Sequence, residues 1–216
     1  MSDLQAACEA EIARLWSGQR DGAHDLGHLR RVWANARIIM AEEPGADPEV
    51  LLIAAYFHDA VNLTKDDPDR ALAATRSGAV AAEWLAGRGF APDRIAATVH
   101  AIEAHSFSAG LTPQTPEARI LQDADRLEAL GAIGIARMFC VAGAMGAALF
   151  DPDDPMAERR ALDDRRYALD HLQVKLFGLA ETMQTRTGTQ MAEARVDWMA
   201  SFRTRLLAEV AGRFAI

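Results

Sequence analysis

A histidine and an aspartate stand side by side at the end of a strongly apolar segment, LLIAAYFHD, as His58 and Asp59. A buried carboxylate is costly unless it is paired or bound to a metal, so this placement needs a chemical reason. In the alternative interpretation, Asp59 faces water where a helix ends and His58 lies half-buried beside it. The adjacent pair is therefore a candidate metal site, with a structural alternative.

Two further aspartates lie in the segment ILQDADRL at residues 120–127, whose apolar residues form a stripe typical of a core-facing helix. Successive helical residues turn by about 100°, so Asp123 and Asp125 lie about 200° apart and cannot both point inward. One of them is a candidate ligand. We expect the other to be solvated or to pair with an arginine.

A third candidate position is the segment HDLGHLRRV at residues 24–32, where a helix is predicted to start. His28 is the better candidate for an inward side chain. His24 precedes it by four residues, which would suit two ligands on one helix face if His24 were helical. Gly27 and the capping signal of Asp25 argue against that, so His24 is equally suited to a hydrogen-bonding role at the helix entry.

Taken in order, these histidines and aspartates resemble the H…HD…D signature of the HD superfamily of metal-dependent phosphohydrolases. The contexts HxxRV, FHD and DADRLEALGAIGIAR match in addition to the single letters. Residue by residue, the resemblance implies these metal ligands: His28, His58, Asp59 and Asp125.

The resemblance extends over nearly the whole chain. The segments at 144–151 and 167–176 are similar to a small bacterial branch of HD hydrolases that includes nucleoside-triphosphate pyrophosphohydrolases. It also favours Asp125 over Asp123, because the family ligand is the aspartate of the ADRL context. The fold that it implies is a single-domain, all-α helical bundle of the HD type.

Two imidazoles and two carboxylates form a mixed nitrogen and oxygen ligand set without a thiolate. Such a set suits one octahedral divalent ion, which we expect to be Mn²⁺, Ni²⁺, Co²⁺, Fe²⁺ or Mg²⁺. A bound dication lowers the pKa of its water and polarises a phosphoryl oxygen. The chemistry indicated is therefore the hydrolysis of a phosphate ester or anhydride.

Two more histidines, His100 and His105, determine whether a second ion is expected. They are five residues apart, about 140° around a helix, so both cannot easily face one site. His105 is the better active-site candidate, as a phosphate donor or proton carrier, and His100 is expected in the core. We therefore expect one ion rather than two.

The residues just after the HD pair are further candidates. Some HD hydrolases carry an acidic residue three positions after the HD aspartate, where this chain has Asn62. An amide can orient water but cannot take its proton, so the general base is open, with Asp66 and His105 as candidates. Lys65, one of two lysines in the chain, could contact a phosphate or be a solvated loop residue.

The elements that must position these residues are predicted to be helices. Strand patterns are almost absent, and Ala, Leu, Arg and Glu recur with helical spacing. A chain of 216 residues suits one domain, with the metal motifs at about 20–130 and the C-terminal helices at about 131–216 completing the same domain. The predicted helices cover about residues 3–17, 26–43, 47–58, 67–87, 92–105, 116–131, 132–150, 158–184 and 189–212.

Composition excludes several classes of protein. A net charge of −8 argues against a general nucleic-acid binder, because a phosphate backbone would be repelled. Two cysteines, Cys8 and Cys140, do not make a disulfide framework and fit a reduced, cytoplasmic chain. The start of the sequence lacks the pattern of a secretory signal. No run approaches 18 apolar residues, so we expect no membrane span.

The leading hypothesis is a phosphohydrolase that acts on a small phosphate substrate, a nucleotide. Through the resemblance, its reaction would be cleavage of a nucleoside triphosphate to the monophosphate and pyrophosphate by a metal-activated water. The alternatives are a nucleoside-monophosphate phosphatase on the same site and a non-catalytic, metal-binding regulatory HD protein. The amphipathic helix at 189–212 could seal the core or support a homodimer.

Overall fold

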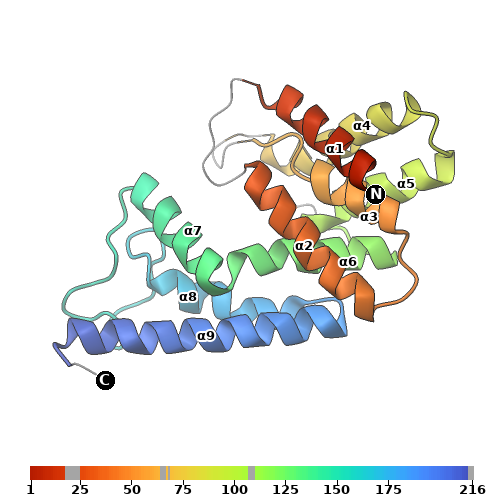
Figure 1. The fold of residues 1–216 in the computed structure, drawn as a ribbon. Coiled ribbons are helices and arrows are strands. Elements are labelled where there is room, and N and C mark those ends of the chain that lie inside the picture. The colour runs from red at the N-terminus through yellow and green to blue at the C-terminus, as the bar shows by residue number, and fades with distance from the viewer. Residues whose placement is uncertain (18–24, 64–66, 68, 107–109, 214–216) are drawn as a thin grey trace. The chain divides into compact units, whose positions relative to one another are not determined.

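The computed structural model describes residues 1–17, 25–63, 67, 69–106 and 110–213, and Figure 1 shows their arrangement. Within these ranges the regular structure is helical, which confirms the predicted all-α fold. The chain divides into two compact units: unit 1 is Met1–Asp125 with Gln184–Gly188, and unit 2 is Arg126–Met183 with Thr189–Ile216. That one domain spans residues 1–216 stays a prediction.

Unit 1 is built around a buried central helix. Its helices are α1 (Ser2–Leu15), α2 (Leu26–Glu42), α3 (Pro48–Phe57), α4 (Ala73–Ala86), α5 (Pro92–His105) and α6 (Pro116–Arg126), with a 3₁₀ turn at Arg70–Leu72. Helix α3 is apolar on all sides and contacts α1, α2, α4 and α5. Asp47 caps its first turn and Pro48 occupies the first helical position. The helix therefore ends in the core at Phe57, and the buried His58 follows it.

Helix α2 is amphipathic and begins at a defined cap. The Asp25 carboxylate accepts a hydrogen bond from the backbone N–H of His28 at 2.8 Å. The buried residues of the helix recur every three or four positions, which is the spacing of one helix face. Its members are His28, Leu29, Val32, Trp33, Asn35, Ala36 and Ile39.

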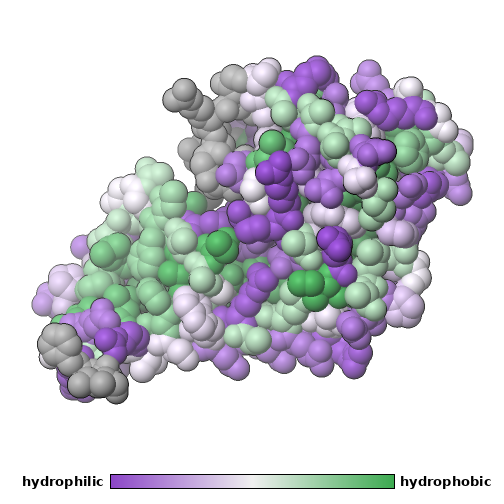
Figure 2. Space-filling model, in the orientation of Figure 1, coloured by the Kyte–Doolittle hydropathy of each residue, from purple (hydrophilic) through white to green (hydrophobic). Residues whose placement is uncertain are grey.

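Unit 2 contains α7 (Gly131–Ala144), α8 (Asp170–Val174), a 3₁₀ helix at Leu176–Thr182 and most of α9 (Arg186–Val210). Helices α7 and α9 meet through Phe139 and Phe202, whose ring centroids are 6.4 Å apart. The helix predicted over 132–150 is shorter than expected: α7 ends at Ala144, and its residue Ile133 is exposed. Figure 2 shows apolar residues on the surface over α7.

The helix predicted over 158–184 is wrong. Residues 145–169 form turns and an isolated bridge between Ala148 and Tyr167 instead. Three carboxylates take up backbone N–H groups that a helix would use: Asp151 accepts from residues 153 and 154, Asp154 from residues 158 and 159, and Asp163 from residues 165 and 166. Such local hydrogen bonds compete with helix formation.

The other predicted helices are found close to their expected bounds, except that α4 begins at Ala73 rather than near residue 67. Among the described helices, none is long and apolar enough to cross a membrane by itself. The bent pair Pro116–Ala129 and Gly131–Ala144 meets that test jointly, by length and composition.

Candidate metal centre

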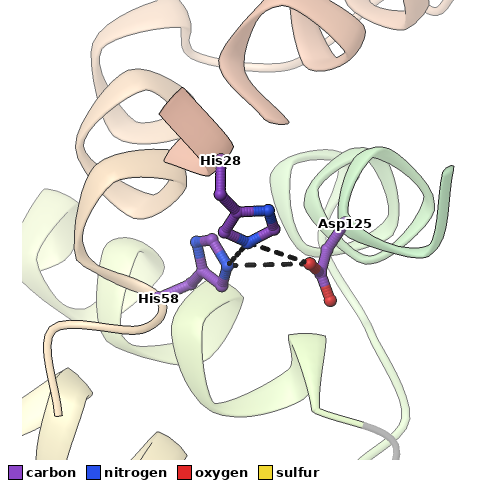
Figure 3. Close-up of side chains that lie close together, drawn as sticks. All are labelled: His28, His58 and Asp125. Atoms are coloured by element: carbon purple, nitrogen blue, oxygen red, sulfur yellow. Dashed lines mark hydrogen bonds and ion pairs between the residues drawn. The ribbon is translucent and has the colours of Figure 1, made fainter. Parts of the chain in front are cut away.

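Three separate elements bring the predicted ligands together in unit 1. His28 comes from the first turn of α2, His58 follows the last residue of α3, and Asp125 lies in the last turn of α6. Figure 3 shows the three side chains pointing toward one another. His28 Nε2 lies 3.3 Å from His58 Nε2 and 3.5 Å from Asp125 Oδ1, and His58 Nε2 lies 3.7 Å from that oxygen.

Asp59 completes the set from the residue after His58. Its Oδ2 lies 3.5 Å from His58 Nε2 and 3.8 Å from His28 Nε2. Both histidines are buried, whereas the side chains of Asp59 and Asp125 are 23% and 30% exposed. The carboxylates therefore form the open side of the cluster, where a substrate can approach.

The tautomer of His58 is set by its surroundings. Its Nδ1 lies 2.9 Å from the carbonyl oxygen of Ala55 and donates a hydrogen bond to it, because a carbonyl can only accept. The lone pair of Nε2 is then directed at His28 and the two carboxylates. This is the usual arrangement of a metal-binding histidine, whose other ring nitrogen donates to a carbonyl or carboxylate.

The donor set fits a divalent ion. The ligand atoms of His28, His58 and Asp125 all lie within 4.8 Å of one another. Adjacent ligands of an octahedral ion with bonds of about 2.1 Å are about 3 Å apart, so the observed separations need little contraction. Two carboxylates balance a charge of about +2, and the imidazoles suit a transition metal.

His105, at the end of α5, lies beside this cluster. Its Nε2 is 3.9 Å from Asp59 Oδ1, and its ring centroid is 4.8 Å from that of His58. Its Nδ1 lies 2.5 Å from the Ile102 carbonyl, which again directs Nε2 inward. Burial, together with the nearby His58, lowers the pKa of His105, so its imidazole is neutral at pH 7.

His100 does not lie in the core, and that prediction is wrong. It is part-exposed, and its Nε2 accepts a hydrogen bond from the backbone N–H of Gln114 at 3.0 Å. The five-residue separation from His105 turns it toward the loop before α6. Only one of the two histidines of α5 therefore faces the cluster.

The remaining candidates follow the HD pair. Asn62 is half-buried, three residues after Asp59. The preceding residue, Val61, donates its backbone N–H to Ser77 Oγ of α4 at 3.0 Å, which holds this segment against the helix. Lys65, Asp66 and His24 lie outside the described residues. The assigned roles of Asn62, Lys65 and Asp66 stay predictions.

Asp123 is fully buried and not solvated, which corrects that part of the expectation from helical spacing. Its Oδ1 accepts from the backbone N–H of Gln184, and its Oδ2 accepts from the backbone N–H and the hydroxyl of Thr185, all at 2.7–2.8 Å. A Cβ at Gly188 would lie 2.3 Å from Asp123 Oδ2, so glycine is needed there. The two aspartates of α6 therefore have different surroundings: Asp123 is buried against residues 184–185, and the part-exposed Asp125 faces the two histidines.

Two buried amides near the cluster were not identified from the sequence. Asn35 Nδ2 donates to the carbonyl of Ala124 at 3.3 Å, and Gln122 Nε2 donates to the carbonyl of Ala104 at 2.7 Å. One signal was available for Asn35. It follows His28 by seven residues and is a polar residue in an otherwise apolar helix stripe.

Comparisons with known proteins agree with this geometry. Residues 25–130 match the family described as the HD domain. The uncharacterized protein YpgQ of Bacillus subtilis is 30% identical over 212 residues, which cover 94% of this chain and 95% of that protein. The solved structure of an HD-superfamily hydrolase from Bacillus thuringiensis is similar with a TM-score of 0.75 and 27% identity, over 96% of this chain and 97% of the other.

A second solved structure is that of Bacillus subtilis YpgQ in complex with ADP. It is similar to this chain with a TM-score of 0.72 and 28% identity, over 96% of this chain and 94% of the other.

Proposed function

Because the chain belongs to the HD domain family and is similar along its length to an HD-superfamily hydrolase, we propose that it is a divalent-metal-dependent phosphohydrolase that acts on nucleotides. One observation carries the proposal: the Nε2 atoms of His28 and His58 lie 3.3 Å apart, and each is 3.5–3.8 Å from one oxygen of Asp59 and one of Asp125. The proposed reaction is cleavage of a nucleoside triphosphate to the monophosphate and pyrophosphate.

A nucleotide substrate is supported by the ADP complex of YpgQ. The pyrophosphohydrolase reaction is supported by the two segments that resemble that branch of the family, 144–151 and 167–176. These segments pair with each other: Ala168 donates its backbone N–H to Ala148 and Leu169 donates to Leu149, at 2.9 and 3.0 Å. The two segments thus form one local structure in unit 2.

The proposed holder of the ion is the set His28, His58, Asp59 and Asp125. When bound there, a divalent ion such as Mn²⁺, Ni²⁺, Co²⁺, Fe²⁺ or Mg²⁺ supplies a Lewis acid for a phosphoryl oxygen and lowers the pKa of a water molecule. The Ala55 carbonyl keeps the His58 ring in the required tautomer. The part-exposed carboxylates leave the cluster open on their side.

Proton handling is assigned to His105. It is neutral at pH 7, its Nδ1–H is held by Ile102, and its Nε2 faces Asp59. This leaves Nε2 free to accept a proton from the attacking water and, once protonated, to pass that proton to a phosphate oxygen. Asn62 is proposed to orient the water, with Asp66 as an alternative base and Lys65 as a phosphate contact.

The test is a product analysis with purified protein. The protein is stripped with a chelator, reloaded separately with Mn²⁺, Co²⁺, Ni²⁺ or Mg²⁺, and incubated with ribo- and deoxyribonucleoside triphosphates and monophosphates. We expect the monophosphate and pyrophosphate in equal amounts, resolved by ion-exchange chromatography. Orthophosphate released only from monophosphates would replace the proposal with a phosphatase. No turnover of any nucleotide by metal-loaded protein would indicate a regulatory protein.

A further inference from the structure

The three residues before Asp125 in α6 each form hydrogen bonds with a different part of unit 1. Gln122 Nε2 donates to the Ala104 carbonyl of α5. The Asp123 carboxylate binds the backbone at residues 184 and 185. The Ala124 carbonyl accepts from Asn35 of α2. Each of these side chains is at most 6% exposed, so the bonds are shielded from water.

The Asn35 bond differs from the other two because it joins α6 to the helix that carries His28. Residues seven apart turn through about 700° and therefore share a helix face. His28 and Asn35 thus contact α6 from the same side of α2, two turns apart. His28 Nε2 faces Asp125 Oδ1 at 3.5 Å, and Asn35 Nδ2 binds the carbonyl of the residue just before Asp125.

The end of α6 also explains why an amide is useful at this position. The α-helix ends at Arg126 and tightens into a 3₁₀ turn at Leu127–Ala129. Carbonyls in the last turn of a helix lack their regular partners and are satisfied by other donors. Asn35 supplies such a donor to Ala124. In return, the carbonyl accepts a hydrogen bond from the buried Asn35 amide.

We propose that Asn35 is a positioning residue for the metal centre: it fixes α6 along α2 and so sets the separation between the His28 imidazole and the Asp125 carboxylate. This inference rests on the proposed metal-dependent function. Positioning of ligands by hydrogen-bonded neighbours is a general property of metal sites. Here the neighbour acts through the backbone of the ligand's helix and not on the ligand itself.

The test compares Mn²⁺ binding by Asn35→Leu and a matched control, Thr98→Val. Thr98 is buried in α5, seven residues before His105, but its hydroxyl bonds to the Arg94 carbonyl of its own helix. Isothermal titration with MnCl₂ gives the dissociation constant of each metal-free protein. Thermal unfolding without metal gives the stability of each, and Asn35→Ala provides a second variant if Asn35→Leu does not fold.

We expect the dissociation constant for Mn²⁺ to rise by about tenfold or more in the Asn35 variants, as when partners of metal ligands are removed. Thr98→Val is expected to change it by less than about twofold, because its bond lies within one helix. Asn35→Gln, which keeps the amide, should recover part of the affinity.

Unchanged Mn²⁺ affinity in folded Asn35→Leu or Asn35→Ala would overturn the inference and leave the proposed function intact. An equal loss of affinity in Thr98→Val would also overturn it, because the effect would then follow from general destabilisation. If the wild-type protein bound none of the tested divalent ions, the proposed function itself would fail, and the inference with it.

Discussion

The two units each contain carboxylates whose surroundings differ: protein donors bind the buried Asp170 of unit 2, whereas the part-exposed Asp59 and Asp125 of unit 1 face histidine nitrogens. In unit 2, Asp170 accepts two hydrogen bonds from the Arg160 guanidinium, at 2.6 and 2.9 Å, and one from the backbone N–H of Asp163 at 2.7 Å. Burial by itself would raise the pKa of Asp170, but Arg160 and the Asp163 N–H lower it below its ordinary value. Donors of the protein itself therefore bind the Asp170 carboxylate, whose role is structural.

In unit 1, Asp59 and Asp125 face the Nε2 atoms of two histidines. In the neutral His58 ring, whose Nδ1 donates a hydrogen bond to the Ala55 carbonyl, Nε2 is an acceptor that faces the two carboxylates. A cation between these groups makes that arrangement favourable. The comparison shows that depth of burial does not identify a ligand: Asp123 and Asp170 are more deeply buried than Asp59 and Asp125, and protein donors satisfy both.

Asp125 and Asp123 of α6 differ most in their expected roles, and their substitution gives the largest expected difference in activity. Asp125→Asn should lower kcat/KM by about a thousandfold or more, equivalent to about 4 kcal/mol in the barrier, because an amide oxygen is a poorer ligand for a dication. Asp123→Asn should lower it less than about tenfold. Steady-state kinetics at saturating metal, with circular dichroism to confirm folding, makes the comparison.

Asp123→Asn should instead lower the free energy of unfolding by about 1–3 kcal/mol, because its amide group would face the N–H donors of residues 184 and 185. If Asp123→Asn proves inactive while folded and Asp125→Asn active, the centre has been assigned to the wrong face of α6.

Because protein donors bind Asp170, its substitution is expected to lower the free energy of unfolding without changing the affinity for Mn²⁺. Asp170→Asn removes the charge that faces Arg160 and leaves the guanidinium without its main partner. We expect the free energy of unfolding to fall by about 3 kcal/mol, as when one member of a buried ion pair is lost. Denaturant unfolding measures the change. A loss of Mn²⁺ affinity in this variant would contradict the separation of the two centres.

A smaller effect is expected at the junction of α1, α2 and α3, where Glu9 accepts hydrogen bonds from Arg30 and Tyr56. These donors, Arg30 first, hold the pKa of Glu9 at about 2. Because the folded-state pKa is depressed, the stabilisation is present above the unfolded value of about 4.3 and is lost as the pH falls toward 2.

Glu9→Gln should therefore lower the free energy of unfolding by about 1.5 kcal/mol at pH 7, and the difference from wild type should shrink through this range. Urea unfolding at pH 7, 4 and 2.5 measures the trend. A difference that grows on acidification would show that Glu9 is not held ionised by these partners.

Much of unit 1 could be predicted from the sequence because its signals are local. Asp47 with Pro48 starts α3, and the apolar composition of α3 requires burial. Residues 145–169 could not be predicted in the same way. Their irregular path depends on which N–H groups Asp151, Asp154 and Asp163 bind, and helical spacing at 158–184 carries no information about that competition.

The candidate site shows the same limit. The order and contexts of the histidines and aspartates were sufficient to expect His28, His58, Asp59 and Asp125 near one another. The fate of Asp123 was not predictable, because its partners are backbone groups about 60 residues later in the chain. The position of His100 was likewise set by the loop before α6 and not by its own helix.

The central claim is that four side chains of unit 1 bind one divalent ion, and metal content tests it most directly. Purified wild type, Asp59→Ala and Asp170→Asn are equilibrated with Mn²⁺, freed of excess metal, and analysed by mass spectrometry, with circular dichroism as the check on folding. We predict about one ion per chain in wild type and Asp170→Asn and almost none in folded Asp59→Ala, which lacks a ligand. Full metal content in Asp59→Ala would contradict the assignment.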